Sequence, residues 1–382
     1  MDKRLGYYTC SGQEFESKLQ ALMHSKSTGN PVNWHFNQEV FDRYNWEAEP
    51  ELSLDQLYDR RSKEIRESYD YVILSYSGGS DSHNILESFL RQGLFVDEVV
   101  INGAFKATEK FIVLDPTEKS NWNINAEYQL NTVEKLNQLK ARSPNTKITV
   151  NDTTDAIIDS FLQGADGAWT KNKKEVLNPN GTNNFNYTFF RDLRVTFDKG
   201  KKVALVIGLD KPKVRVINGQ CYLFFIDKIA NITQIQDHII EYPNLRTEMF
   251  YWHPDSCDML AKQAHVILRL INSSEHYKKI FEDTSATAIR FTQEKLLRSI
   301  LYTTWKDEWF QVDKPIKDWD CEYDYWFSRG WAGTPAHESW KRGLAHVAKQ
   351  IGKTVMNADG TLFGPPPIFS KFYYVGPVKG QQ

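Results

Sequence analysis

The chain has 382 residues, of which 41% are hydrophobic and 25% are charged, a composition typical of a globular protein with one large domain or two ordinary ones. Its 47 Lys and Arg residues against 49 Asp and Glu give a formal net charge of −2. That balance excludes an overall basic footprint for nucleic acid, although it leaves a local basic patch, and hence a nucleic-acid partner, open.

Hydropathy and cysteine usage restrict the class further. No apolar run approaches the length of about 18 residues that a membrane span needs. The start MDKRLGYYTCSGQEF lacks the apolar core of a secretory signal, so we expect a cytoplasmic protein with no membrane partner. The cysteines are widely separated and contain no C-x-x-C pair, so we interpret them as buried reduced thiols and not as a zinc site or redox pair; they are Cys10, Cys221, Cys257 and Cys321.

The first segment, residues 1–69, is predicted to form a cap that packs on the domain after it. Its last part, SLDQLYDRRSKEIRESY, places Leu54, Leu57 and Ile65 on one helical face. Ser53 directly precedes this face and has the side chain of an N-cap. The aromatic side chains of the segment fit core packing better than ligand stacking, which stays the alternative.

The sequence of residues 71–82, YVILSYSGGSDS, is typical of a strand followed by a phosphate-binding turn and a helix. The apolar, β-branched run predicts a buried strand over 71–76, and the stretch after the glycines predicts a helix over 82–92. Glycines permit a sharp turn without a Cβ to obstruct a ligand, and a new helix offers free backbone N–H groups to an anion. The residues of this predicted phosphate loop are Ser77, Gly78, Gly79, Ser80, Asp81 and Ser82. Asp81 is suited to hold Mg²⁺ or to cap the turn.

SGGSDS fits the pattern S-G-G-x-D-S and resembles the pyrophosphate loop of the PP-loop ATP pyrophosphatases. More generally, the chain resembles PP-loop proteins of bacteriophages, mainly around residues 52–82 and 250–272, which implies a host cytoplasm. The resemblance implies ATP and Mg²⁺ as cofactors, with Asp81 as a metal ligand and catalytic residue. Members of this superfamily cleave ATP between the α and β phosphates and adenylate a substrate oxygen. A nitrogen or sulfur nucleophile then displaces AMP.

From 70 to 230 the sequence alternates strands and helices, which predicts an α/β domain with a mostly parallel, doubly wound sheet. The resemblance implies the adenine nucleotide alpha-hydrolase type of this fold. Further strands are predicted at 97–102, 147–150 and 203–207, with an extra one at 110–114, and helices at 126–141, 153–163 and 186–198. The ligand crevice belongs at the carboxyl ends of the parallel strands. Residues 165–185 predict a solvated loop, with an active-site lid as the alternative.

Two further strand ends complete the predicted site. The strand over 97–102 leads to Ile101, Asn102 and Gly103, where the resemblance places the adenine. The strand over 203–207 is followed by a glycine and charged residues that we expect at the same edge of the sheet: Gly208, Asp210, Lys211 and Arg215. Lys211 is assigned the stabilisation of charge on the α-phosphate or the departing pyrophosphate. A solvated basic turn before a hairpin stays the alternative.

The rest of the chain predicts a hairpin and then helices. KVRVINGQCYLFFID reads as a hairpin with Asn218-Gly219 at its turn. Residues 231–382 form the predicted C-terminal, mainly helical region, in which Asp255 or Ser256 caps a helix in DSCDMLAKQAHVILRLINS. SSEHYKKIFED and ATAIRFTQEKLLRSILYTTW continue the helical pattern.

These features favour an adenylating enzyme that acts on ATP and an unidentified small-molecule or nucleotide acceptor, as a monomer or an oligomer. The first alternative is a sulfonucleotide reductase-like enzyme. The tail FSKFYYVGPVKGQQ counts against it, because it lacks the cysteine that such reductases place near their end. The second alternative is a nucleotide-binding module without catalysis, against which the intact phosphate loop counts.

Overall fold

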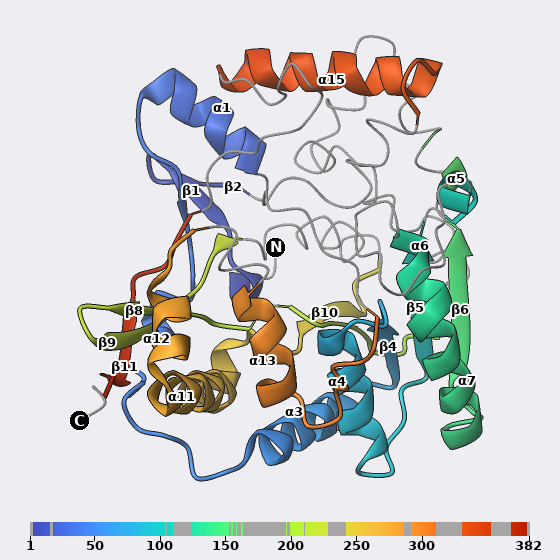
Figure 1. Ribbon diagram of the computed structural model, residues 1–382. Coiled ribbons are helices and arrows are strands. Elements are labelled where there is room, and N and C mark those ends of the chain that lie inside the picture. Colours follow the sequence, from blue (N-terminus) through green and yellow to red (C-terminus); the bar gives the residue numbers. More distant parts are fainter. Residues whose placement is uncertain are drawn as a thin grey trace.

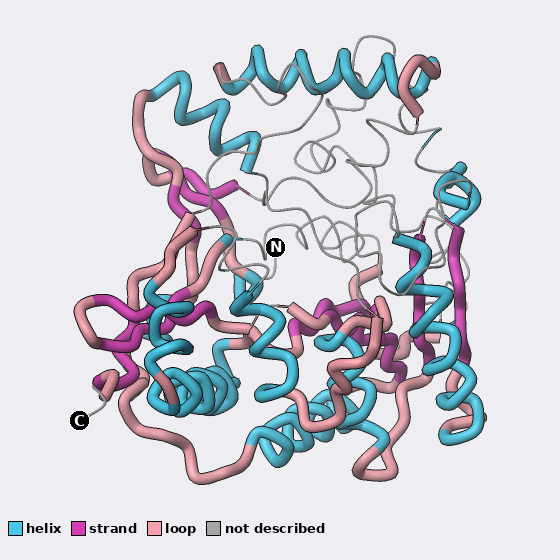
Figure 2. Tube along the Cα trace, in the orientation of Figure 1, coloured by secondary structure: helices cyan, strands magenta, loops and turns pink. Residues whose placement is uncertain are grey.

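The computed structural model describes residues 3–15, 18–103, 105–109, 124–152, 199–209, 211–227, 242–285, 292–310, 331–352 and 368–379, and a few single positions between 154 and 196. Among these residues the strands form three sheets, one of five strands and two of three. Figure 1 shows strands of the five-stranded sheet beside the helices α4 (Ser80–Leu90) and α7 (Val133–Arg142), which alternate with them along the chain. Figure 2 distinguishes strands from helices by colour.

The five-stranded sheet is parallel throughout and has the order β10-β7-β4-β5-β6. Its strands are β4 (Tyr71–Ser75), β5 (Glu98–Gly103), β6 (Lys147–Asp152), β7 (Val203–Ile207) and β10 (Leu245–Met249). From β4 the chain builds outward through β5 to β6, and then returns to the other side of β4 with β7. The strand order therefore reverses between β4 and β7, which is where doubly wound folds place their ligands.

The predicted α/β class with a doubly wound parallel sheet is confirmed. Strand β7 has the predicted bounds, and β4, β5 and β6 differ from their predictions by one or two residues at an end. Strand β10 was not predicted, and it extends the sheet beyond residue 230 of the chain. Its sequence LRTEM contains a buried glutamate, Glu248. The cost of burying this carboxylate is offset because Arg61 donates a hydrogen bond to it at 2.6 Å. The predicted strand at 110–114 and the predicted loop or lid at 165–185 lie outside the described residues. Of the helices predicted at 153–163 and 186–198 only single positions are described, and these are helical.

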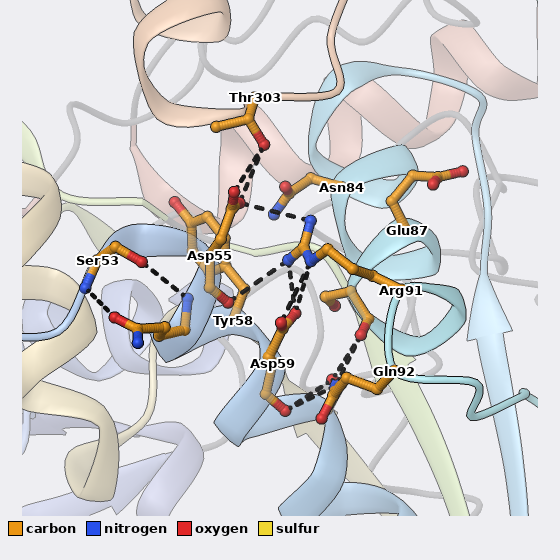
Figure 3. A network of polar contacts seen from close by, with 12 residues as sticks. Ser53, Asp55, Tyr58, Asp59, Asn84, Glu87, Arg91, Gln92 and Thr303 are labelled. Carbon is orange, nitrogen blue, oxygen red and sulfur yellow. Dashed lines mark hydrogen bonds and ion pairs between the residues drawn. The ribbon is translucent and has the colours of Figure 1, made fainter.

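Helix α3 (Leu54–Ser68) delivers the chain into β4. Its predicted N-cap is confirmed: Ser53 Oγ accepts from the Gln56 amide at 3.2 Å, and Gln56 Oε1 accepts from the Ser53 amide at 2.9 Å. Helix α4 (Ser80–Leu90) packs beside α3. Figure 3 shows the polar network between the two helices, in which the Arg91 guanidinium lies 2.5 Å from Asp59.

The helix predicted at 126–141 is continuous but not uniform. It runs as α6 (Ile124–Glu127), the π-helical turn η4 (Tyr128–Thr132) and α7 (Val133–Arg142). Arg142 fixes the end of α7 to α4 by donating to both carboxylate oxygens of Glu87, at 2.5 and 2.9 Å. A π turn inside an α-helix shifts the side chains after it relative to those before it. Here it lies next to the phosphate loop.

The hairpin prediction is confirmed by β8 (Lys213–Ile217) and β9 (Gln220–Phe224), whose turn residues Asn218 and Gly219 both have positive φ. The third strand of this sheet is β11 (Tyr373–Pro377), antiparallel to β9. The C-terminal region is therefore not only helical. Its aromatic tail forms a strand because Tyr373 and Val375 bury their side chains in the core.

The described residues among the first 46 form a small sheet of β1 (Tyr8–Cys10), β2 (Gln13–Phe15) and β3 (Asn33–Trp34) with the helices η1 (Lys3–Leu5), α1 (Lys18–Thr28) and α2 (Gln38–Phe41). The aromatic side chains of this segment support the packing interpretation, because Trp34, Phe36, Phe41 and Trp46 are buried. Figure 1 shows α1 beside α15 (Pro335–Ile351), and Lys26 of α1 donates to the Lys349 carbonyl at 2.9 Å.

Besides α15, the described helices after β10 are η7 (Pro254–Ser256), α11 (Cys257–Ser273), α12 (Glu275–Glu282) and α13 (Glu294–Leu301), and α5 (Phe105–Thr108) follows β5. Ser256, one of the two predicted caps, is the N-cap residue of α11, but its side chain makes no cap hydrogen bond. The side-chain cap belongs to the preceding 3₁₀ turn η7, where the His253 ring accepts from the Asp255 amide. Cys10, Cys221 and Cys257 are buried free thiols, as predicted. None of the described helices combines the length and apolarity that crossing a bilayer requires.

Candidate functional site

The predicted phosphate loop follows β4 directly and forms the first turn of α4. Gly78 has φ of +80°, and a Cβ at this position would lie 2.0 Å from Thr132 Oγ1, so that only glycine fits. Gly79 is the N-cap of α4 and provides no side-chain acceptor. The first N–H groups of α4 therefore lack the usual side-chain partner, and they lie at the positive end of the helix dipole. This is the geometry of an anion site.

Hydroxyl groups close the loop on itself. Ser77 Oγ accepts from the Gly79 amide at 3.2 Å, and Ser82 Oγ accepts from the Ser77 amide at 3.3 Å. The two hydroxyl oxygens lie 3.2 Å apart. Ser77 is exposed, whereas Gly78, Gly79, Ser80 and Ser82 are buried. The loop thus presents a small open face, with its shape fixed by its own side chains.

Two carbonyl groups of the loop are held by the neighbouring helix. Thr132 Oγ1, in the π turn, donates to the Ser77 carbonyl at 3.3 Å, and Lys135 Nζ, in α7, donates to the Gly78 carbonyl at 2.8 Å. Neither residue was predicted as part of the site. They occupy ordinary positions of an amphipathic helix, and nothing local in the sequence indicates a contact 55 or 57 residues away.

Lys211 lies at the edge of the sheet that carries the loop, where we expected it, and it forms an ion pair with Asp81 that was not predicted. Lys211 Nζ lies 2.8 Å from Asp81 Oδ1, and the Lys211 side chain is only 7% exposed while that of Asp81 is 38% exposed. Burial alone would raise the pKa of the Asp81 carboxyl. The Lys211 charge and the hydrogen bonds from Lys211 and Tyr302 outweigh that effect, so that the pKa lies below its ordinary value and Asp81 is ionised.

Gly208 brings the end of β7 into close contact with the loop. A Cβ on Gly208 would lie 3.3 Å from the Asp81 Cβ and 3.4 Å from the Ser82 amide nitrogen. Any larger residue would press on the first turn of α4. Gly208 therefore has a steric role, and it allows the residues after β7 to pass over the loop.

Two buried tyrosines donate hydrogen bonds to Asp81. Tyr302, directly after α13, donates to Asp81 Oδ1 at 2.5 Å, and Tyr251 donates to the Asp81 carbonyl at 2.9 Å. Asn84 of α4 in turn donates to the Tyr251 hydroxyl at 3.0 Å. Burial raises the pKa of both phenols well above the ordinary value, and the Asp81 charge adds to this, so both are neutral donors. Sequence reasoning missed both tyrosines.

The segment after α13 is anchored beside the loop. Thr303 Oγ1 donates to both carboxylate oxygens of Asp55 at 3.0 Å, as Figure 3 shows, which fixes the neighbouring Tyr302 relative to α3. The next turn brings Trp305 and Trp309 against α4 and α7, with their ring centroids 5.1 Å apart in an edge-to-face contact. A segment more than 200 residues from the loop in sequence thus forms one wall of the site.

The remaining predicted residues that the structure describes lie in two places, at the end of β5 and within β8. Asn102 of β5 accepts from Asn151 of β6 at 3.0 Å, and Gly103 packs closely on the Phe105 ring. Ile101 is buried within β5. These residues lie at the end of the strand next to β4, and their described contacts are the hydrogen bond of Asn102 and packing contacts. Asp210 lies outside the described residues.

Arg215 is not brought to the loop. It lies within β8 of the second sheet, where its guanidinium stacks over the rings of Phe224 and Phe372 at 5.3 and 5.8 Å. The prediction placed it at the site because it follows Lys211 closely in sequence. The chain instead enters β8 at Lys213, and that strand leads away from the parallel sheet.

Comparison with protein-family models, curated proteins and solved structures gave no match to this chain. The assignment of the site therefore depends on its own residues.

Lys211 and Tyr302 both contact Oδ1 of Asp81, and among the described residues no hydrogen bond or ion pair involves Oδ2. The described residues contain no group of three His, Cys, Asp or Glu side chains placed as a metal site. Asp81 thus fits an ion shared with phosphate oxygens, because Mg²⁺ in nucleotide sites takes only one or two carboxylates.

Proposed function

We propose that the chain is a PP-loop ATP pyrophosphatase that binds Mg·ATP where the strand order reverses, between β4 and β7, and adenylates an acceptor. One observation carries this proposal: the ion pair of Lys211 with Asp81, over a helix start that lacks a side-chain cap. A cation, a carboxylate and free N–H groups are the groups that a metal-bound triphosphate requires.

The strand order supports the finer fold assignment. Numbered along the chain, the sheet order β6-β5-β4-β7-β10 is third, second, first, fourth, fifth, as in nucleotide-binding doubly wound folds. The motif S-G-G-x-D-S then favours the adenine nucleotide alpha-hydrolase type of this fold. The acceptor is proposed to be a small molecule or a nucleotide.

The proposed reaction needs few chemical groups from the protein. An acceptor oxygen attacks the α-phosphorus, the bond to the bridging oxygen breaks, and pyrophosphate leaves with the electron pair. The N–H groups of α4 bind the leaving phosphates, and Lys211 stabilises the negative charge that develops on them. Asp81 would hold Mg²⁺ through Oδ2, and the ion would screen charge on the phosphates. A nitrogen or sulfur nucleophile then displaces AMP from the acceptor.

Thiol chemistry of the sulfonucleotide reductase type finds little support in the described residues. Burial raises the pKa of Cys221 to about 12, and burial together with nearby Asp258 and Asp255 does the same for Cys257. Both thiols are therefore protonated at neutral pH and unreactive. Cys10 is also buried, and its sulfur contacts Ser11, Thr28 and the Asn30 carbonyl and not the loop. Cys321 lies outside the described residues.

The direct test measures AMP and pyrophosphate after incubation with Mg·ATP and a panel of candidate acceptors. We expect both products in equal amounts, and a loss of about 100-fold or more in Asp81→Asn and Lys211→Met. Lys371→Met is the matched control, because Lys371 pairs with Asp42 at the surface. Release of ADP and phosphate would contradict the proposal. ATP binding without either product would favour the non-catalytic module.

A further inference from the structure

We propose that Lys135 is a positioning residue of the phosphate loop, which turns the Gly78 carbonyl away from the bound anion and adds a second cation on the side opposite Lys211. The inference deepens the proposed function and rests on it, because it assumes that the loop binds phosphate. The inference does not follow from the S-G-G-x-D-S motif, because Lys135 belongs to α7 and Lys211 follows β7, both outside the motif.

The topology places the two lysines on the two sides of the loop. Strand β4 lies between β7 and β5 in the sheet, and the loop extends from its carboxyl end. Lys211 follows β7, and its Nζ contacts Asp81 at 2.8 Å. Lys135 lies on the connection between β5 and β6, and its Nζ contacts the Gly78 carbonyl at 2.8 Å. Each strand that flanks β4 thus leads to one buried lysine at the loop.

The contact with Gly78 decides which way the loop's peptide groups point. In a trans peptide the carbonyl and the following N–H point in opposite directions, so the ammonium that holds the Gly78 carbonyl also orients the Gly79 N–H. Thr132 binds the Ser77 carbonyl in the same way. Two carbonyl dipoles that would repel a phosphate are thereby turned toward α7. The face of the loop that remains carries the first N–H groups of α4 and the Ser77 hydroxyl, which accepts from the Gly79 N–H at 3.2 Å.

Aromatic rings enclose the Lys135 ammonium. Its Nζ lies 4.0 Å from the ring centroid of Trp309 and 4.6 Å from that of Trp305, within cation–π range, and the residue is only 4% exposed. Among the described residues no carboxylate lies within ion-pair distance of it, although Glu127 and Glu134 act on it from farther away. Within the described part of the chain, its positive charge therefore has no close anionic partner, and a bound phosphate would supply one.

The surroundings make this charge sensitive to pH. Burial lowers the pKa of Lys135 to about 8, against the opposing effect of Glu127 and Glu134. The groups that face it from α4 and from the end of α7 do not titrate with it. Burial, Lys135 and Arg142 lower the pKa of His83 to about 3, so that its ring is neutral, and Arg142 is engaged by Glu87. Protonated Lys135 attracts phosphate, so binding strengthens below about pH 8 and weakens above it.

The experiment measures the affinity for inorganic pyrophosphate by calorimetry from pH 6.5 to 9.5, in the wild type and in Lys135→Met and Lys135→Arg. Pyrophosphate itself titrates in this range, so the comparison is between the profiles of the proteins. We expect Lys135→Met to bind about tenfold or more weakly at pH 7, with a difference from the wild type that vanishes toward pH 9.5. Lys135→Arg should recover part of the affinity and keep it at high pH, because arginine stays charged.

Lys140→Met is the matched control, since Lys140 is an exposed lysine of the same helix. It should bind as the wild type does. A Lys135→Met protein with wild-type affinity and an unchanged pH profile would overturn the inference while leaving the proposed function intact. If Lys135→Met does not fold, the Lys135→Arg profile decides alone: a weakening above pH 8 as large as in the wild type overturns the inference. A wild type that binds no pyrophosphate at any pH contradicts the phosphate site and both proposals.

Discussion

Lys211 and Asp81 are 130 residues apart in the chain, and their side chains meet at 2.8 Å across the point where the strand order of the parallel sheet reverses. Asp81 stands in the first turn of α4, and Lys211 follows the neighbouring strand β7. The pair joins the two halves of the sheet at its carboxyl edge. A ligand bound there contacts both halves at once.

A double-mutant cycle tests whether this pair acts as a unit. We expect Asp81→Asn and Lys211→Met each to destabilise the protein, and the double variant to be more stable than the sum predicts. The coupling energy should be about 1 kcal/mol, because Asp81 is 38% exposed and solvent screens the pair. Denaturant unfolding of the four proteins gives the value. A coupling energy of zero would show that the contact does not form in solution.

Gly78 and Gly93 offer a matched pair for testing the turn. Both have positive φ, at +80° and +70°, but a Cβ on Gly93 meets nothing within 4 Å, whereas one on Gly78 meets Thr132 Oγ1 at 2.0 Å. We expect Gly93→Ala to cost about 1 kcal/mol of unfolding free energy and to leave ATP binding unchanged. Gly78→Ala should cost more and abolish ATP binding. Equal effects of the two substitutions would mean that Thr132 does not close on the loop.

Tyr302→Phe removes the hydroxyl that donates to Asp81 and keeps the aromatic ring in place. Among the described residues, Lys211 is then the one partner left to Asp81 Oδ1, so the pKa of Asp81 should rise toward its ordinary value and the carboxylate should be held less firmly. We expect the rate of pyrophosphate release to fall about tenfold, with a loss of about 1 kcal/mol in stability. Tyr374→Phe, in β11 of the second sheet, is the control. Unchanged kinetics in Tyr302→Phe would remove this tyrosine from the site.

The low pKa of Asp81 also predicts how stability depends on pH. A carboxyl whose pKa is lower in the folded than in the unfolded state stabilises the protein above the unfolded value, which is about pH 4. That contribution disappears as the pH falls through the folded value. We therefore expect the difference in unfolding free energy between wild type and Asp81→Asn to shrink below about pH 4. A difference that stays constant from pH 7 to pH 3 would contradict the assignment.

Local signals in the sequence were sufficient for the elements that form the sheet and the loop. The run VALVI predicts β7 with its observed bounds, and Ser53 forms the predicted N-cap of α3. The S-G-G-x-D-S turn joins strand and helix in the predicted order. Each of these features depends on residues within a few positions of one another, which a periodic or motif reading captures.

The missed features depend on contacts between distant segments. Tyr302 reaches Asp81 over 221 residues, and no pattern around YTTW distinguishes it from a core tyrosine. Strand β10 was missed because a glutamate, here Glu248, is typical of a surface position. Its burial depends on the hydrogen bond from Arg61 of α3, which the sequence does not reveal. Arg215 is the opposite case: we predicted it at the site because it is close to Lys211 in sequence. It lies instead in β8 of the second sheet, over the ring of Phe224.

The most direct test of the account is a crystal structure of the protein with Mg²⁺ and α,β-methylene-ATP, an analogue that resists cleavage between the α and β phosphates. We expect the β and γ phosphates at the start of α4, in contact with Lys211, and the metal ion on Asp81 Oδ2. The α-phosphate should face open space for an acceptor. A nucleotide bound elsewhere on the chain, with the loop empty, would contradict the account.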